Sequence, residues 1–532
     1  MGAKESTRSP ECEGPGIARS RRRIGCLWIP SLVLTKRVKT KLPILKLLST
    51  PATQTVRSIS YTAASQLIVL LLNLLTVAIL ARILTPGDFG IVGVGMLFMA
   101  LFASIQDSGV TSALIQRDGR IEDSISVGLS LRWIIAGVLF IAIFGFSPII
   151  ADFYDDPAIM PVIVVMSANL FIQPIAFSSY VLLNRKLEFS RLAIAGVVQG
   201  MTTAVVSIGL ALLDFSYWSI VLGSLSGSVS LVLVMRYYER TSFRPRIDKK
   251  LMRELLEFGA HLLVVALMAF VVFSVDQLVV GKVLGIVTLG VYFVSIRFGR
   301  TLGDQIAGTV NRVLFPTMAR IKDSLEHLKV GYVQSLRMIA MIAVPLSLGL
   351  SALSSLFVTV VLGQRWIAVS VPLAILSFQG LLNALITPAA NVLISIGKPK
   401  YMSIQTSIQA VAMVVAIYPV AVLFGITGVC VLTTSLSLGV LVYFVIVFSS
   451  IFKARFIEIV SPMVPSLVSG LVMYSALVLL ALLVQRDVLW LVTLSVLGTI
   501  LYVVVLHFVS KGRDVRDLIA LFERAFLGRQ SI

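Results

Sequence analysis

Residues 65–110 have the sequence SQLIVLLLNLLTVAILARILTPGDFGIVGVGMLFMALFASIQDSGV, two apolar blocks joined by a short polar turn. A helix needs about 20 apolar residues to cross the ~30 Å hydrocarbon layer of a membrane. Similar blocks recur along the 532 residues, of which 57% are hydrophobic and 13% charged. Soluble domains carry about 25% charged residues. The sequence therefore predicts an all-α integral membrane protein of about 14 transmembrane helices.

Hydropathy over windows of about 19 residues predicts two sets of six spans followed by one further pair. The first set lies near 59–81, 89–113, 125–149, 158–183, 190–213 and 217–237. The second set lies near 258–281, 288–316, 336–362, 367–396, 401–423 and 427–451. The last pair lies near 462–484 and 488–509.

These spans define an N-lobe over 58–240, a C-lobe over 258–452 and a C-terminal pair within 460–510. The charged segment 241–257 is expected to form a cytoplasmic linker with a short interfacial helix. Residues 511–532 are expected to lie as an amphipathic tail along the inner membrane surface, with a disordered tail as the alternative. Residues 1–57 are Arg-rich and are expected to be a disordered extension; an organelle transit peptide or an over-long gene start are the alternatives.

The basic residues predict the orientation. Of 45 Lys and Arg residues, 37 lie on the side of the membrane that holds the N-terminus, and four lie inside spans. The opposite loops hold only Arg82, Lys282, Arg365 and Arg486. Because Lys and Arg accumulate in cytoplasmic loops, both termini are expected in the cytoplasm. The basic residues lie between spans and form no single patch, so nucleic acid is not an expected partner.

An internal repeat is visible between ARILTPGDFGIVGVG, which starts at Ala81, and GKVLGIVTLGVYFVS, which starts at Gly281. The offset of 200 pairs Arg82 with Lys282, Leu84 with Leu284, and Gly90 with Gly290. A second match places Pro174 over Pro388. The pattern predicts two lobes related by a parallel repeat, with a site between them. A proline inside a membrane helix frees a carbonyl and permits bending, so these two prolines are candidate gating positions.

Seven charged residues lie at least four residues from either end of a predicted span: Asp107, Arg132, Asp276, Arg297, Arg300, Asp304 and Arg312. A charge in hydrocarbon costs at least ~2.5–3.5 kcal/mol, so such residues usually face a wet cavity or a charged partner. In span 288–316 one helical face carries Arg297, Arg300, Asp304 and Asn311, with Arg312 at its edge.

Two interpretations of this face remain open. It is either a salt-bridge cluster that joins helices or a cationic cavity for a diphosphate, because guanidinium offers paired donors to phosphate oxygens. The second interpretation makes Arg297, Arg300, Arg312 and Asn311 candidate substrate-binding residues. Arg300 and Asp304 are spaced to pair, which leaves Arg297 without a local partner.

The acids Asp276, Asp304 and Asp107 are candidates for binding a coupling ion or for lining the cavity; a structural hydrogen bond or ion pair is the alternative. Arg132 lies near a span end, from which its side chain could extend to the interface. The chain lacks GxxxxGK and HExxH motifs, and its three cysteines suggest no metal site. We expect no cofactor, no bound metal and no enzymatic activity. The short outer loops argue against a polymerase.

Three stretches resemble the polysaccharide transporter family of Wzx-type flippases: LARILTPGDFGIVGVG from Leu80, DSGVTSALIQR from Asp107 and DQLVVGKVLGIVTLGVY from Asp276. The resemblance extends from about Val56 to Phe508. It implies two six-helix lobes around a central cavity. Asp276 matches the aspartate typical of the family's seventh span.

The resemblance also implies a function. Members move undecaprenyl-diphosphate-linked oligosaccharides across the bacterial inner membrane by alternating access, for exopolysaccharide or lipopolysaccharide biosynthesis. An H⁺ or Na⁺ gradient is the implied energy source, and membrane lipids, a polysaccharide polymerase and a chain-length regulator are the implied partners. The alternatives are a drug/cation antiporter of the same superfamily, a lipid II flippase and, from another class, a membrane glycosyltransferase or polymerase.

Overall fold

The computed structural model describes residues 52–107, 121–186, 188–240, 246–320, 324–484, 487–514 and 516. Most of the predicted extension 1–57 and of the predicted tail 511–532 lies outside these ranges, as do positions 241–245 of the linker. Within the described residues the regular structure is entirely helical. The predicted all-α class is therefore confirmed.

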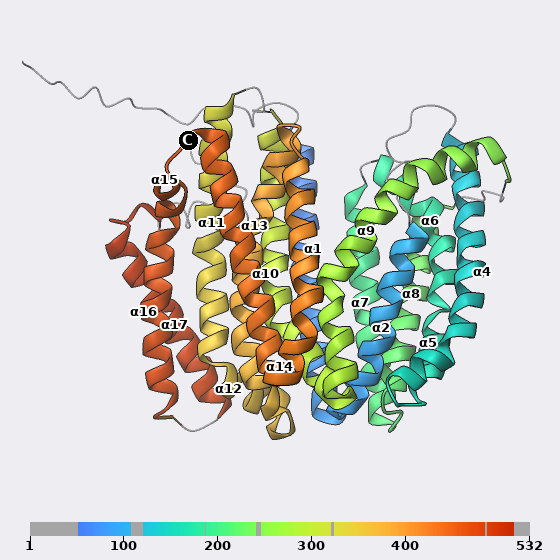
Figure 1. The fold of residues 1–532 in the computed structure, drawn as a ribbon, viewed down its shortest axis with the longest axis horizontal. Helices are drawn as coiled ribbons and strands as arrows, with labels where there is room; N and C mark the ends of the chain where they lie inside the picture. The colour runs from blue at the N-terminus through green and yellow to red at the C-terminus, as the bar shows by residue number, and fades with distance from the viewer. Residues whose placement is uncertain are drawn as a thin grey trace, which may run out of the picture. The chain divides into compact units, whose positions relative to one another are not determined.

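The N-terminal half contains seven described helices. They are α1 (Ala52–Ile83), α2 (Pro86–Asp107), α4 (Ile121–Phe153), α5 (Ile159–Met166), α6 (Asn169–Arg185), α7 (Phe189–Leu212) and α8 (Trp218–Tyr238). Figure 1 draws this half in blue to green, with α4 to α8 grouped on the right.

The C-terminal half continues to the red end of the chain in Figure 1. Its first elements are α9 (Lys249–Leu284), α10 (Ile286–Arg320), α11 (Leu325–Ala352), α12 (Ser354–Phe357), the π-helix η2 (Val358–Leu362), the 3₁₀ helix η3 (Gln364–Val369), α13 (Ser370–Ser395) and α14 (Lys400–Phe452). The last elements are α15 (Phe456–Val460), the 3₁₀ helix η4 (Ser461–Met463), α16 (Val464–Ala481) and α17 (Val488–Val509).

Twelve helical segments of the described chain are long and apolar enough to cross a membrane. Two helices account for the difference between these twelve segments and the fourteen predicted spans. Helix α10 has 35 residues but carries the polar face, and it is not among the twelve. Helix α14 has 53 residues and counts once, although Gly425 (φ 60°) interrupts its helical backbone inside the predicted gap between spans 401–423 and 427–451. The chain is a multi-pass membrane protein, and fourteen crossings stay a prediction.

The turn between α1 and α2 follows from three residues. The Thr85 main-chain N–H donates to the Asp88 carboxylate at 2.8 Å, and the Asp88 N–H donates to the Thr85 hydroxyl at 3.3 Å. This reciprocal pair is a capping box, which satisfies N–H groups that the first helical turn leaves open. Pro86 occupies the first position of the helix, where no N–H is needed. The sequence TPGD therefore ends one span and starts the next.

The same pairs of spans pack together in both halves. In the N-terminal half α2 packs on α5, and α4 packs on α5 and α6. In the C-terminal half α10 packs on α13, and α11 packs on α13. Between the halves, α2 lies against α10 and α9. Helices α16 and α17 pack on each other and on α11, so the last pair is attached to the C-terminal half.

The structure differs from the predicted linker in one respect. Helix α9 starts at Lys249 and continues through the seventh span without a break, so no separate interfacial helix exists over its described residues. Its first turns carry Leu255, which is buried, with Leu251 and Met252 packed on Ile125 and neighbouring residues of the N-terminal half. Figure 1 shows α9 running obliquely between the halves. Burial of this apolar face continues the helix past the predicted boundary.

Candidate functional site

Close contact between α10 and α13 positions the predicted polar face. A Cβ atom on Gly303 would lie 2.0 Å from the main-chain oxygen of Gly380. The missing side chains therefore allow the two backbones to touch, as small residues do at membrane helix contacts. Arg300 and Asp304 lie on α10 beside this crossing, and Asn383 lies on α13 one turn beyond Gly380.

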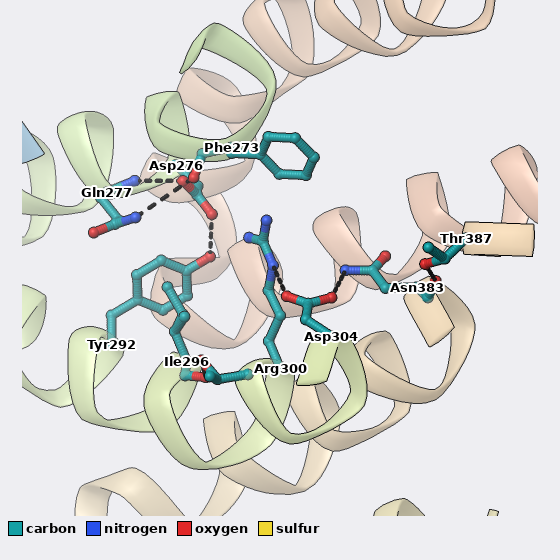
Figure 2. Close-up of polar contacts among 10 residues, drawn as sticks. Phe273, Asp276, Gln277, Tyr292, Ile296, Arg300, Asp304, Asn383 and Thr387 are labelled. Carbon is teal, nitrogen blue, oxygen red and sulfur yellow. Dashed lines mark hydrogen bonds and ion pairs between the residues drawn. The ribbon is translucent and has the colours of Figure 1, made fainter. Parts of the chain in front are cut away.

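Arg300 pairs with Asp304, as their spacing predicted. The Arg300 Nε lies 3.7 Å from the Asp304 Oδ2, and the Asn383 amide donates to Asp304 at 3.4 Å. The Arg300 guanidinium also lies over the Phe273 ring, 4.9 Å from its centre. Figure 2 shows Arg300 extending between Asp304 and Asp276. One guanidinium thus lies between two carboxylates.

Asp276 is 1% exposed on α9. It accepts a hydrogen bond from the Tyr292 hydroxyl at 2.7 Å and one from the Gln277 main-chain N–H at 2.8 Å (Figure 2). A buried carboxylate needs such donors because it has lost its water shell. Tyr292 lies on α10 and is itself fully buried, so the hydrogen bond joins two helices of the C-terminal half.

A small cavity of about 20 Å³ opens beside these groups. Its polar lining comprises Asp276, Arg300, Gln379, Asn383, Gln409, Thr433 and Ser437. A volume of ~10–15 Å³ already holds one water molecule, so the space suits a water molecule or a small unhydrated cation. Tyr292, Gln379 and Asn383 are not among the site residues predicted from the sequence. The signal in the sequence that marks Gln379 and Asn383 is the i,i+4 spacing of two amides within one span.

Arg297 occupies a different environment from Arg300. Its guanidinium lies 5.2 Å from the centre of the Phe293 ring and 3.8 Å from the Met96 sulfur on α2. Within the described residues it has no carboxylate partner. Because α2 belongs to the N-terminal half, this half-buried cation lies where the two halves meet.

Asp107 and Arg132 form an ion pair outside this cluster. Their side chains meet at 3.0 Å, and the Arg132 guanidinium lies 4.7 Å from the centre of the Phe177 ring. Arg132 is 7% exposed, so its side chain does not extend to the interface as the sequence suggested. The buried stacking on Phe177 and the attraction to Asp107 keep it inside the N-terminal half.

The remaining predicted site residues are placed less fully. Asn311 and Arg312 lie in α10, but their side chains fall outside the described set. Pro174 lies inside α6 and Pro388 inside α13, and both are buried. Neither proline breaks its helix; the fourth span is interrupted earlier, at 167–168. Their gating role stays a prediction.

Residues 79–371 match the family described as "Polysaccharide biosynthesis protein". The lipopolysaccharide biosynthesis protein WzxC of Escherichia coli is 27% identical over 354 residues, which cover 64% of this chain and 70% of that protein. The teichuronic acid biosynthesis protein TuaB of Bacillus subtilis is 25% identical, over 64% of this chain and 70% of that protein.

Among solved structures, the fold is similar to that of the lipid II flippase MurJ in an inward closed conformation. The TM-score is 0.73 at 14% identity, and the match covers 86% of this chain and 99% of that chain. At this identity the similarity establishes the fold alone. The fold class expected from the sequence, an all-α bundle of many membrane-spanning helices, is confirmed by it, and the division into two six-helix lobes stays a prediction.

Proposed function

Because the chain belongs to the polysaccharide biosynthesis protein family, we propose that it moves a lipid-linked oligosaccharide across a bacterial inner membrane by alternating access. WzxC and TuaB carry names from lipopolysaccharide and teichuronic acid biosynthesis, and MurJ is named a lipid II flippase. The substrate proposed here is an undecaprenyl-diphosphate-linked repeat unit for exopolysaccharide or lipopolysaccharide synthesis. Both termini lie in the cytoplasm in this proposal.

The observation that carries the proposal is Arg297, a cation between the two halves with no carboxylate partner in the described chain. A half-buried cation within a membrane span is costly without an anion, unless a ligand supplies the opposite charge. The diphosphate is that ligand, since a guanidinium offers two parallel donors to phosphate oxygens. The sugar follows the diphosphate through the space between the lobes, and the polyprenyl chain stays in lipid.

Arg300 connects substrate binding to ion coupling in this proposal. Arg300 lies between Asp276 and Asp304 (Figure 2). A cation or proton that neutralises Asp276 therefore weakens the electrostatic attraction between Asp276 and Arg300. The released guanidinium then turns towards the diphosphate. Asp276 and the neutral oxygens of the adjacent cavity are suitable ligands for a proton or for Na⁺.

The test compares charge variants in a strain whose polymer export depends on this gene. Arg297→Ala is expected to reduce export at least tenfold, about the cost of losing one charge-assisted contact. Arg297→Lys retains a charge without the paired donors and is expected to export at an intermediate rate. Arg365→Ala is the matched control, because Arg365 is an exposed cation outside the site.

Export unchanged in Arg297→Ala, with the protein inserted normally, would refute the role of Arg297. Intracellular lipid-linked repeat units should accumulate in the variant with unaltered sugar composition. A changed composition would instead indicate a glycosyltransferase or polymerase. Rescue of a strain depleted of its lipid II flippase, or drug efflux from a pump-deficient strain, would indicate the rival transport activities.

Asp276→Asn tests the coupling step in proteoliposomes. The substitution keeps the shape of the side chain and removes its charge. Transport driven by an imposed Na⁺ or pH gradient is expected to lose its dependence on that gradient, while binding of the lipid-linked sugar persists. Asp107→Asn is the control acid, since Asp107 lies apart from the cavity. Gradient dependence retained in Asp276→Asn would remove Asp276 from the coupling step.

A further inference from the structure

The two copies of the repeated sequence meet each other in the structure. A Cβ atom on Gly290 would lie 1.8 Å from the Pro86 main-chain oxygen and 3.0 Å from the Gly90 nitrogen. A Cβ atom on Gly90 would lie 2.0 Å from the Ile286 oxygen. The glycines that align at an offset of 200 residues therefore form a backbone contact between α2 and α10, one from each half.

The repeated cations lie on either side of this crossing. At the end of α1, Arg82 donates from Nε to the Val361 carbonyl at 2.8 Å and from Nη2 to the Val360 carbonyl. At the end of α9, the Lys282 ammonium lies 2.9 Å from the Asp155 carboxylate. The first contact joins span one to the end of span nine, and the second joins span seven to the end of span three. Exchanging each span for its counterpart in the other half, span one for span seven and span nine for span three, converts one contact into the other, as a two-fold relation requires.

A third pair of contacts follows the same rule. The Trp366 indole donates to the Ala81 carbonyl at 2.7 Å, and the Tyr154 hydroxyl donates to the Leu278 carbonyl at 3.5 Å. Each aromatic residue follows the third span of its own half and contacts the first span of the other half. Phe89 packs edge-on against Trp366, with 5.2 Å between ring centres.

We propose that the segments 81–95 and 281–295 form a two-fold symmetric gate that closes the outer side of the transporter. The Gly90–Gly290 crossing is its centre, and the Arg82 and Lys282 contacts hold its two rims. This assignment rests on the proposed alternating-access function and on the predicted orientation, which places Arg82, Lys282 and Arg365 in outer loops. The Arg82 and Lys282 side chains at the rims are exposed, so their contacts are weak enough to separate. The Gly90–Gly290 crossing determines how closely the backbones of the two halves approach.

Thiol labelling from outside the cell tests the gate without any sugar substrate. Met96→Cys places a single reporter between the halves, in a background with Cys12 and Cys26 replaced by Ser and Cys430 by Ala. Whole cells are treated with a membrane-impermeant methanethiosulfonate. The parent is expected to label slowly, because the closed gate lies between Met96 and the outside.

Lys282→Asp is expected to raise the labelling rate by about fivefold, the equivalent of one partly exposed ion pair. The double variant Asp155→Lys/Lys282→Asp restores the pair with reversed charges and should return the rate towards that of the parent. Arg365→Ala is the charge control and should label like the parent, since it removes a neighbouring exposed cation.

Gly290→Ala is expected to raise labelling at least tenfold, since its methyl group meets backbone atoms that cannot move aside. Gly145→Ala is its control, because a Cβ atom there meets nothing within 4 Å. Size-exclusion profiles and thermal unfolding establish that each variant is folded. Labelling as slow as in the parent in both Lys282→Asp and folded Gly290→Ala would refute the assignment of these segments as a gate. A labelling rate in the charge-swapped double variant that stays as high as in Lys282→Asp would refute it as well.

The outcome separates this inference from the proposed function. If the labelling pattern holds while Arg297→Ala exports normally, the gate stands and the diphosphate site fails. If Arg297→Ala blocks export while the gate variants label like the parent, the site stands and the gate fails.

Discussion

The Gln106 side-chain amide donates to the Leu170 main-chain carbonyl at 2.6 Å, in the buried contact between α2 and α6. Pro174 lies four residues after Leu170 and has no N–H to offer this carbonyl. A side chain of the second span therefore satisfies an acceptor that a proline left open in the fourth. The contact ties the bend-permitting proline of the N-terminal half to a neighbouring helix.

Gln106→Leu is therefore expected to lower the free energy of unfolding by about 1–3 kcal/mol, since a buried carbonyl loses its donor. Unfolding in SDS, followed by circular dichroism, measures the change. Pro174→Ala supplies a main-chain N–H to Leu170, so the double variant should lose less stability than Gln106→Leu alone. Equal losses in the two backgrounds would show that the freed carbonyl is not the cause.

The α10–α13 crossing predicts a sharp contrast between two glycines of one helix. Gly303→Ala forces a methyl group to 2.0 Å from the Gly380 oxygen and should cost at least ~3 kcal/mol or prevent folding. Gly308→Ala adds a methyl group with nothing within 4 Å and should be neutral or stabilise by up to ~1 kcal/mol. Yields of monodisperse protein and thermal unfolding midpoints distinguish the two. Similar behaviour of both variants would contradict the close crossing.

The Asp107–Arg132 pair is expected to support structure in the N-terminal half. Asp107→Asn weakens the anion beside the buried Arg132 and should destabilise by about 1–3 kcal/mol. Transport per folded molecule and its dependence on the ion gradient should stay unchanged. Measuring both transport and the unfolding midpoint separates the two roles. A variant of normal stability that loses gradient dependence would make Asp107 a coupling residue.

The Asp276–Tyr292 hydrogen bond predicts an energetic coupling between α9 and α10. Tyr292→Phe removes one donor from a buried carboxylate and should cost about 1–3 kcal/mol. In an Asp276→Asn background the same substitution should cost less, because a neutral amide needs the donor less than a carboxylate does. A double-mutant cycle on unfolding free energies gives the coupling. Additive losses would mean that the two side chains act independently.

Local sequence patterns predicted most of the architecture. The apolar blocks, the gap at Gly425 and the TPGD turn each depend on a few neighbouring residues, and the structure confirms the helices around them. The Arg300–Asp304 pair was predictable for the same reason, since it lies within one helix turn. The start of α9 was not, because Leu255 continues that helix by packing in a cluster with residues more than seventy positions away.

The candidate site was predictable only in part. Helical geometry groups Arg297, Arg300 and Asp304 on one face, but it does not distinguish their surroundings. The tertiary structure gives Arg300 two carboxylate neighbours and places Arg297 against Met96 of the other half. It also supplies Tyr292 as the donor to Asp276 from another helix.

The sequence by itself determined that this chain crosses a membrane many times and that one span carries several charges, and it predicted a duplication of the two halves. These properties depend on the free energy of transferring each segment from water to lipid and on the spacing of residues along one helix. Only the tertiary structure decided that Gly90 touches Gly290 and that Arg82 and Lys282 bind equivalent span ends. Such contacts depend on how the helices pack side by side. Lipid solvates the apolar faces of all spans equally well, so the hydrophobic effect does not determine which helices become neighbours. Close packing between particular helices determines it.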